Sequence, residues 1–577
     1  MRLSSSKSKN SESFYIIKDF VKDGKRSTKI IHKIGNIEKI KRLAGGMDYK
    51  EWLKEYVKKY KNKHYKNEIV IIEKNNQKPI SKDVKTTFDI GYVFLNAIYN
   101  DLGIKDICDE IQSEYKFKFN LNEVFSYLTY ARIIYPSSKF RTFKLCQSFI
   151  KAPTFKLHDE YRALSYLAEN LDIIQEKIFN NSVKVLNRNS KVIYYDCTNY
   201  YFEIHQEDEL RKYGYSKQHQ PKPLVGMGLF LDGDGLPLAF NIHPGNKSEF
   251  KTLIPTENKI LKNFKLKDTK IILCTDAGLS SDEIKKFNTD KGRAFVITQP
   301  IKKLKEDYQN EVFDNEGWRI YGDLRNVYNL DHIKGSVELR KKHFETVFYK
   351  IIQSETNSVK QDMIATFSLK YLDYQRNIRR GQIERAEKAI ESNDISRKGK
   401  NQNDIKRFIK TVATTKDGEE ATEQSCYIDQ AIIEKEEKYD GYYAITTNLV
   451  GDVKQILNIV KGRWQIEESF RIMKHDFLAR PVELSREDRI KSHFITCFVA
   501  LLIYRILEQK LNKQYTTTEI LDCLRTMKLF ESKGDGYMPL YERTDLTDTL
   551  HEVFNFRTDY EINTYQDIEK ILSNINK

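Results

Sequence analysis

The segment Lys191-Val-Ile-Tyr-Tyr-Asp196 marks the point where apolar residues change from helical spacing to the spacing of strands. Before it, the spacing predicts helices over residues 90–102, 122–134 and 160–186. After it, short apolar runs predict strands over 224–231, 236–242, 270–275 and 294–298, with helices over 248–263 and 281–287. A helical region therefore leads into a mixed α/β region.

The order of the elements after this segment predicts a fold. Three strands, a helix, a strand, a helix and a strand is the order of the RNase H-like fold. The next helix of that fold is delayed to residues 452–475, after a strand over 441–447, because residues 301–440 intervene. Runs over 346–352 and 363–368 predict strands in this insertion. We therefore predict an α/β protein, an RNase H-like mixed sheet interrupted by an insertion, with helical N-terminal and C-terminal parts.

Changes of pattern along the chain also predict its domains. Two β-rich runs around Lys22-Asp-Gly-Lys25 indicate a hairpin near the N-terminus, followed by a lysine-rich helical stretch and a linker at 75–79. A plain structural hairpin and a DNA-contacting arm are both compatible with this unit. The predicted domains are a hairpin and helix unit (1–84), a helical DNA-binding region (85–190), the first half of an RNase H-like catalytic core (191–300), an insertion (301–440), the second half of the core (441–512) and a C-terminal helical region (513–577).

The segment Lys461-Gly-Arg-Trp-Gln-Ile-Glu-Glu-Ser-Phe-Arg-Ile-Met-Lys474 combines acidic and basic residues in a pattern suited to phosphodiester chemistry. At about 100° per residue, a helix places Arg463, Glu467 and Lys474 within about 60° on one face. A carboxylate suits a divalent cation, and flanking cations suit phosphate oxygens. An exposed helix with ordinary charge pairs is the alternative for this segment taken alone.

Two aspartates stand at the ends of predicted strands. Asp196 ends the strand that begins at Lys191, and Asp276 follows the strand over 270–275. If these strands are adjacent, the two carboxylates are level at one edge of the sheet, where Glu467 can join them. Three such carboxylates can hold two Mg²⁺ ions about 3.5–4 Å apart. Each aspartate alone could instead close a turn with its own backbone.

Composition limits the classes of function. The 97 Lys and Arg against 82 Asp and Glu give a net charge of +15, which favours a polyanionic partner. The seven cysteines are scattered and form no Cys-x-x-Cys pair, which indicates reduced thiols and argues against a zinc site. The longest apolar run, 494–504, is too short for a membrane span and predicts a buried helix. No membrane partner is expected.

Several motifs together resemble the DDE transposases of bacterial insertion sequences, and within them the IS-four-like group. The resemblance covers about residues 85–510 and implies that the RNase H-like sheet is interrupted by a mainly β insertion. The segments that carry it are Tyr195-Asp-Cys-Thr-Asn-Tyr-Tyr-Phe-Glu203, Gly214-Tyr-Ser-Lys217, Gly235-Leu-Pro-Leu238, Gly245-Asn-Lys-Ser-Glu249, Thr275-Asp-Ala-Gly278, Tyr374-Gln-Arg-Asn-Ile-Arg-Arg-Gly-Gln-Ile-Glu-Arg-Ala386 and Arg463-Trp-Gln-Ile-Glu-Glu-Ser-Phe-Arg471.

The resemblance implies roles for the candidate residues. Asp196, Asp276 and Glu467 would be the catalytic, metal-binding triad. Arg463 and Lys474 match the family pattern Tyr-x2-Arg-x3-Glu-x6-Lys and would contact DNA phosphates. The tyrosine position of that pattern is Val460 here, which removes one possible hydrogen bond to phosphate.

Two tryptophans are candidates for stacking on a base. Related transposases bind a flipped base on an aromatic residue, and such a contact contributes about 1–3 kcal/mol. Trp318 lies in the insertion and Trp464 lies beside Arg463. Ordinary packing inside the protein is the alternative for both.

The predicted function is that of an insertion-sequence transposase. It would bind terminal inverted repeats, cleave the 3′ ends by two-metal hydrolysis and join them to target DNA. The implied cofactor is Mg²⁺, with Mn²⁺ as a substitute, and the implied partners are DNA and a second copy in a homodimeric synaptic complex. The expected location is the cytoplasm, associated with the nucleoid through DNA. The alternatives are an RNase H-like nuclease without strand transfer and a non-catalytic DNA-binding protein derived from a transposase.

Overall fold

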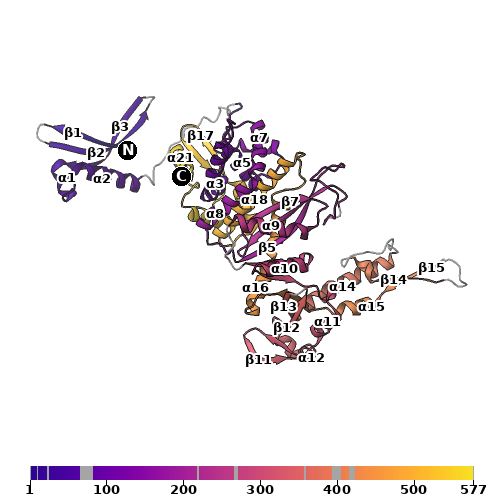
Figure 1. Cartoon of the computed structure of the whole chain (residues 1–577). Helices are drawn as coiled ribbons and strands as arrows, with labels where there is room; N and C mark the ends of the chain where they lie inside the picture. Colours follow the sequence, from indigo (N-terminus) through magenta and orange to yellow (C-terminus); the bar gives the residue numbers. More distant parts are fainter. Residues whose placement is uncertain are drawn as a thin grey trace. The chain divides into compact units, whose positions relative to one another are not determined.

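The computed structural model describes residues 2–8, 11–22, 25–64, 82–217, 220–264, 271–356, 359–392, 404–414 and 423–575. Contacts divide the chain into two compact units (Figure 1). Unit 1 contains Met1–Lys85 together with Glu531–Tyr537, and unit 2 contains the rest. The linker predicted at 75–79 lies outside the described residues.

The N-terminal part of unit 1 contains an antiparallel sheet followed by two helices. Strands β1 (Arg2–Ser8), β2 (Ser11–Lys22) and β3 (Lys25–Asn36) pair in chain order. Helices α1 (Ile37–Ala44) and α2 (Tyr49–His64) follow, and the Asn36 side chain caps α1 by accepting from the Lys39 amide. The predicted hairpin is confirmed by the pairing of β2 with β3, although its Asp-Gly turn lies outside the described residues.

Helices form one layer of unit 2. In chain order they are α3 (Tyr92–Asp101), α4 (Ile104–Ser113), α5 (Leu121–Ile134), α6 (Lys139–Cys146), α7 (Leu157–Glu169), α8 (Leu171–Val185), α18 (Glu487–Lys510), α19 (Thr517–Thr526), α20 (Asp545–Phe554) and α21 (Tyr565–Ile575). A separate small sheet contains β18 (Gly536–Pro539), β17 (Lys528–Ser532) and β4 (Thr87–Asp89), and its residues 531–537 are assigned to unit 1. The helix predicted over 160–186 is two helices, with a break at Asn170.

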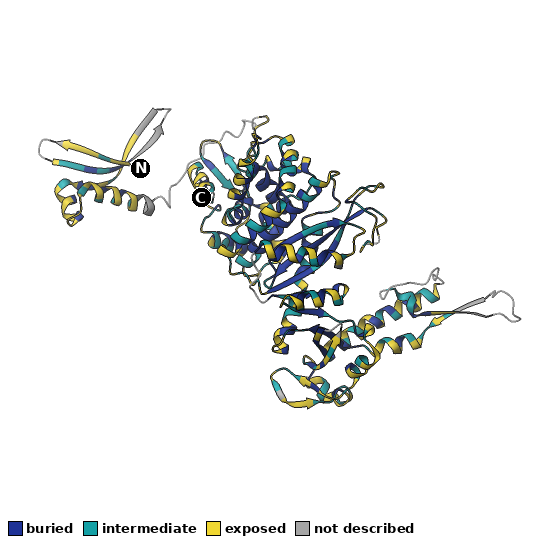
Figure 2. Ribbon diagram, in the orientation of Figure 1, coloured by how far each residue is buried: buried dark blue, intermediate teal, exposed yellow. Residues whose placement is uncertain are grey.

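Helix α18 is the centre of this helical layer. By length and composition it is apolar enough to cross a membrane, but 94% of its most apolar window is buried inside the fold. In Figure 2 the interior of this region is mostly dark blue, the colour of buried residues, while yellow, exposed stretches lie on the outer helices. The prediction that residues 494–504 form a buried helix is therefore confirmed.

The sheet of unit 2 contains the predicted RNase H-like arrangement. Its strands are β5 (Val192–Tyr201), β6 (Leu224–Asp232), β7 (Pro237–Pro244), β8 (Ile272–Thr275) and β9 (Ala294–Thr298). They lie in the order β7-β6-β5-β8-β9. Strand β6 is antiparallel to its neighbours β5 and β7, whereas β8 and β9 are parallel to β5. Helices α9 (Glu249–Asn263) and α10 (Asp282–Asp290) connect the last three strands. This strand order confirms the predicted fold.

Strands of the insertion continue the same sheet. Strand β16 (Tyr442–Thr447) pairs with β9 on one side and with β13 (Val359–Ser368) on the other, and β12 (Val347–Thr356), β10 (Trp318–Ile320) and β11 (Asp323–Tyr328) follow outward. The insertion contains more helix than the resemblance implied. Its helices are α11 (Glu306–Phe313), α12 (Leu330–Gly335), α13 (Val337–Lys342), α14 (Leu369–Glu391) and α15 (Gln430–Glu437), and β14 (Ile409–Thr414) pairs with β15 (Glu423–Ile428).

The helix predicted over 452–475 is broken. Helix α16 (Val453–Gly462) ends where α17 (Trp464–Arg471) begins, and a π-helical turn follows at Ile472–Asp476. The Tyr194 hydroxyl of β5 donates to the Ile459 carbonyl at 2.9 Å, while the Arg463 amide bonds to the Val460 carbonyl, one residue closer than in an α-helix. Contact with the sheet thus tightens the chain at Arg463 and turns α17 into a separate helix.

Candidate active site

Asp196 and Asp276 are level on neighbouring strands. Tyr195 of β5 is in register with Thr275 of β8 in a parallel pair, so the next residue on each strand is an aspartate. Strand β5 does not end at Asp196 as predicted, because it continues to Tyr201 through pairing with β6. Asp276 directly follows β8 and accepts a hydrogen bond from the Ala277 amide. The expected alignment of the two carboxylates at one place in the sheet is confirmed.

Glu467 is joined to this pair through Arg463. Arg463 stands at the junction of α16 and α17, and Glu467 lies in the first turn of α17. One guanidinium nitrogen of Arg463 lies 3.0 Å from a Glu467 oxygen, and the other lies 3.9 Å from an Asp276 oxygen. The break between the helices therefore places one arginine between two of the three predicted metal ligands.

Asp196 has a perturbed pKa because its carboxyl is buried. Burial raises the pKa of Asp196 to about 6, with a further upward contribution from the negative charge of Asp276, while Lys217 and the Cys197 amide oppose the rise. Burial acts to lower the pKa of Arg463, but Asp276 and Glu467 outweigh it and raise the pKa. A buried carboxylate beside a second one is unfavourable unless a cation joins them.

Two lysines are held next to Asp196. The Lys474 ammonium donates to the Thr198 hydroxyl of β5, and burial together with Arg480 and Lys217 lowers the pKa of Lys474 to about 8. The Lys217 ammonium donates to the Cys197 carbonyl at 2.6 Å and lies 3.1 Å from Glu249. Lys217 is not among the predicted site residues. Its segment, Gly214-Tyr-Ser-Lys217, carries the family resemblance without an assigned role.

A tyrosine from another strand also reaches the site. Tyr443 of β16 shares a hydrogen bond of 2.7 Å with Thr298, and its pKa is raised by burial while Arg463 lowers it and Asp276 raises it. Its phenol is thus close enough to Arg463 and Asp276 to interact with both. This chain has Val460 where the family pattern has its tyrosine, so local sequence carries no signal for Tyr443.

The three carboxylates suit hard divalent cations. Oxygen ligands from carboxylates are what Mg²⁺ and Mn²⁺ prefer. Their oxygens do not all lie within 4.8 Å of one another, whereas the ligand atoms of one other compact cluster in the described residues do. A site for two ions about 3.5–4 Å apart spreads its ligands more widely than a site for one ion. The donor set fits a divalent metal.

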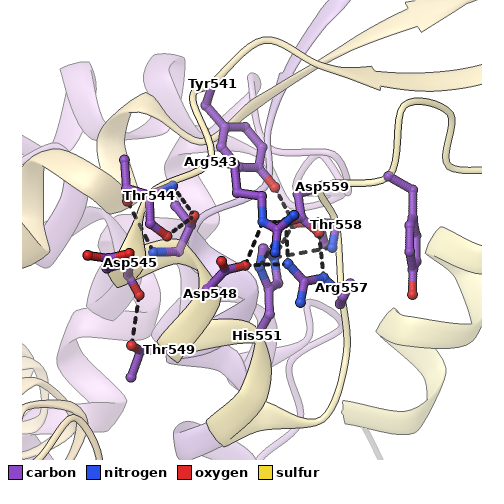
Figure 3. A network of polar contacts seen from close by, with 12 residues as sticks. Tyr541, Arg543, Thr544, Asp545, Asp548, Thr549, His551, Arg557, Thr558 and Asp559 are labelled. Carbon is purple, nitrogen blue, oxygen red and sulfur yellow. Dashed lines mark hydrogen bonds and ion pairs between the residues drawn. The ribbon is translucent and has the colours of Figure 1, made fainter.

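That compact cluster is Asp548, His551 and Asp559, and it is an ion-pair network (Figure 3). Arg557 donates to Asp559 at 2.6 Å and lies 2.5 Å from Asp548, and Arg543 donates to Asp548 at 2.8 Å. Two guanidinium groups thus satisfy the carboxylates. These contacts explain the cluster without a metal ion.

The two candidate tryptophans occupy opposite environments. Trp464 is 55% exposed at the start of α17, so its ring is accessible beside Arg463. Trp318 is 0% exposed and lies in the core of the insertion, where its indole N–H donates to the Asp314 carbonyl at 2.8 Å. The prediction that Trp318 binds DNA is wrong, because no face of the ring is available to a base.

Trp318→Ala is therefore expected to destabilise the fold rather than to change DNA contacts. Removing a fully buried indole leaves a cavity, and such changes cost about 3–5 kcal/mol. Urea unfolding of the full chain measures the loss, with Trp464→Ala as the exposed control. Equal stability of the two variants would contradict the burial of Trp318.

Comparison with known proteins identifies the family. A model of the transposase DDE domain matches residues 201–503, more than half of the chain. The chain belongs to the transposase DDE domain family. The matched range contains Asp276 and Glu467, and Asp196 lies five residues before it. Membership supports a DNA-cleaving enzyme that depends on divalent metal, while the IS-four-like subgroup stays a prediction.

Other comparisons add little to this family assignment. No curated protein matches the chain. A solved piggyBac transposase in a synaptic complex with hairpin DNA is 7% identical, with 84% of this chain and 85% of that chain covered, at a TM-score of 0.37. A likeness this weak carries no argument, so the fold of this DDE transposase rests on its strand order.

Proposed function

We propose that this DDE transposase moves an insertion sequence: it binds the terminal inverted repeats, cleaves the 3′ ends and joins them to target DNA. The observation that carries the proposal is the alignment of Asp196 with Asp276, joined by Arg463 to Glu467, in a chain of this family. The three acids are separated by 80 and 191 positions in the sequence, and a shared metal site requires such distant carboxylates to come together.

The three acids would hold the metal and the cations would hold the DNA. Mg²⁺ or Mn²⁺ bound by Asp196, Asp276 and Glu467 would activate the attacking oxygen and neutralise charge on the phosphate. In cleavage, water bonds to phosphorus and the 3′ oxygen leaves as a hydroxyl; in joining, that hydroxyl bonds to a target phosphorus and a target 3′ oxygen leaves. Arg463 and Lys474 would orient the phosphate oxygens, and Trp464 would present its exposed ring to DNA.

Two ends must be cut together for an element to move, so we propose a homodimer in the synaptic complex. We place the protein in the cytoplasm, bound to the nucleoid through DNA. Both statements follow from the proposed reaction rather than from a contact within this chain.

Cleavage of labelled DNA that carries the gene's own flanking ends tests the proposal. Nicking at the repeat boundary in Mg²⁺, absent in EDTA, would support it. Cutting without end preference and without joining would favour the nuclease, and firm binding without cutting in any metal would favour the DNA-binding protein.

Lys217→Gln is expected to weaken end binding about tenfold, because we propose that Lys217 and Lys474 flank the scissile phosphate. Both ammonium groups are fixed to consecutive residues of β5 just after Asp196. The measurement is affinity in EDTA for end DNA carrying either a normal phosphate or an uncharged methylphosphonate at the cleavage junction. A coupling of about 1.4 kcal/mol between the lysine and the phosphate corresponds to that tenfold change.

The losses of affinity caused by Lys217→Gln and by the methylphosphonate should not add. Once Lys217 is replaced, removing the phosphate charge should cost little more. Lys259→Gln is the control, since Lys259 is also paired with a carboxylate, Asp172 at 2.6 Å, but on the far part of α9. Equal methylphosphonate penalties in wild type and Lys217→Gln would show that Lys217 only ties β5 to Glu249.

A further inference from the structure

The positive charge of the chain is concentrated in its first 85 residues. Residues 1–85 contain 23 Lys and Arg against 10 Asp and Glu, a net charge of +13. Of the 97 basic and 82 acidic residues in the whole chain, this leaves 74 and 72 for residues 86–577, a net charge of +2. The unit that contains the candidate active site is thus close to neutral, and the excess that attracts a polyanion belongs to unit 1.

Part of this charge lies on side chains that the structure describes, in a folded unit. Unit 1 has its own apolar core, formed by Phe14, Ile16, Ile34, Ile40, Leu53 and Val57. Between the sheet and α2, His32 stacks on Tyr60 with ring centroids 4.8 Å apart, and its Nε2 lies 3.2 Å from the Tyr56 hydroxyl. These contacts fix which face of α2 points to the sheet and therefore which face is left to solvent.

A row of lysines lies on the solvent side of α2. Lys50, Lys54 and Lys58 follow one another at intervals of four residues and are all exposed. Four residues advance a helix by about 6 Å, close to the axial rise of about 7 Å over two phosphates of one DNA strand. Neither Lys54 nor Lys58 forms an ion pair with any residue whose side chain the structure describes. The row is available for an external anion.

Unit 1 has other exposed cations besides this row. They are Lys29 and Lys33 on β3, Lys39, Lys41 and Arg42 on α1, and Lys59 on α2. Such a density of cations on a surface of about one small domain is the electrostatic footprint of nucleic-acid binding.

We infer that unit 1 binds duplex DNA through its phosphates, without reading bases, and supplies most of the salt-dependent affinity of the chain for DNA. Binding of this kind gains its free energy from the counterions that the phosphates release. The nearly neutral unit 2 is left to recognise the shape and chemistry of the cleavage site. The inference rests on the proposed function only for the choice of DNA as the polyanion.

The test compares two triple variants of the full-length protein. Lys50→Gln/Lys54→Gln/Lys58→Gln removes the row, and Lys105→Gln/Lys184→Gln/Lys435→Gln removes three exposed lysines of unit 2 with the same change in charge. Affinity for end DNA and for random duplex DNA is measured from about 50 to 300 mM salt. Each lost phosphate contact lowers the slope of log affinity against log salt by about 0.9.

The row variant is expected to lower the slope by about 3 and to weaken end DNA and random DNA alike. The unit 2 variant should change the slope by less than about 1. A third variant with Arg at the three row positions should keep the wild-type slope, and its normal binding would exclude misfolding as the cause. Equal slopes for the two Gln variants would overturn the inference.

Cleavage separates this inference from the proposed function. At saturating protein and low salt, the row variant should still nick the ends in Mg²⁺, because the candidate active site is unchanged. If the salt slopes of all variants are as expected but the wild-type protein never nicks DNA, unit 1 remains the DNA-binding unit and the proposed transposase activity is refuted. Loss of affinity for end DNA alone, with random DNA unaffected, would also overturn the inference, since it would mean base reading.

Discussion

Glu467→Gln is expected to lower cleavage of end DNA at least about 10³-fold in Mg²⁺ and to leave end binding in EDTA within about twofold. Gln keeps the shape of the side chain but lacks the charge that a divalent ion requires, and a loss of about 4 kcal/mol in the transition state corresponds to a factor of about 10³. The Glu467 side chain is 58% exposed, so its replacement leaves no buried polar group unpaired. Arg463 keeps its contact with Asp276.

The neighbouring residue offers a matched control. Glu468 is one position along the same helix and is paired with Arg471 at 2.9 Å, away from Arg463. Glu468→Gln removes the same charge and should cleave normally. If both variants cleave like wild type while EDTA still abolishes the reaction, the metal is held elsewhere and Glu467 is not a ligand.

Local patterns predicted the central strands because each is a short apolar run with clear boundaries. The run over 294–298 became β9 with the same limits, and the run over 224–231 became β6 with one added residue. Local patterns gave no sign that β10, β12 and β13 continue the sheet through β16. That pairing joins segments separated by the helices of the insertion, so it depends on tertiary contacts that no short window contains.

The same distinction applies to the candidate site. Asp196 and Asp276 could be aligned from sequence because each stands in or next to a strand of a recognised order. The helix break at Arg463 could not be predicted from sequence, because its cause is a hydrogen bond that the Tyr194 hydroxyl of β5 donates to the Ile459 carbonyl. Lys217 and Tyr443 also come from segments remote from the triad. Trp318 was misassigned because a tryptophan in a polar stretch of sequence carries no signal of whether strands will enclose it.

Asp196→Asn is expected to abolish cleavage and, in EDTA, to stabilise the protein by about 2 kcal/mol at pH 8. Burial and the neighbouring Asp276 raise the pKa of Asp196 from 3.8 to about 6. A raised pKa means that the folded state binds the proton more tightly than the unfolded state, so this contribution to stability is present below about pH 4 and is lost as the pH rises through about 6. Asparagine does not titrate, so its advantage over wild type should grow between about pH 4 and 6 and then stay constant.

Adding Mg²⁺ should reverse this order of stability. A free metal concentration of about 100 times the dissociation constant adds about 2.7 kcal/mol to the free energy of unfolding of the wild type. A protein without Asp196 gains much less from the same concentration. Asp109→Asn is the control, since Asp109 is exposed on α4, and it should follow wild type at every pH and metal concentration. If Asp196→Asn and wild type gain equally from Mg²⁺, Asp196 does not bind the ion. A purely structural carboxylate would instead give a loss of stability on conversion to Asn at pH 8, because its hydrogen bond from the Cys197 amide would weaken without relief of a buried charge.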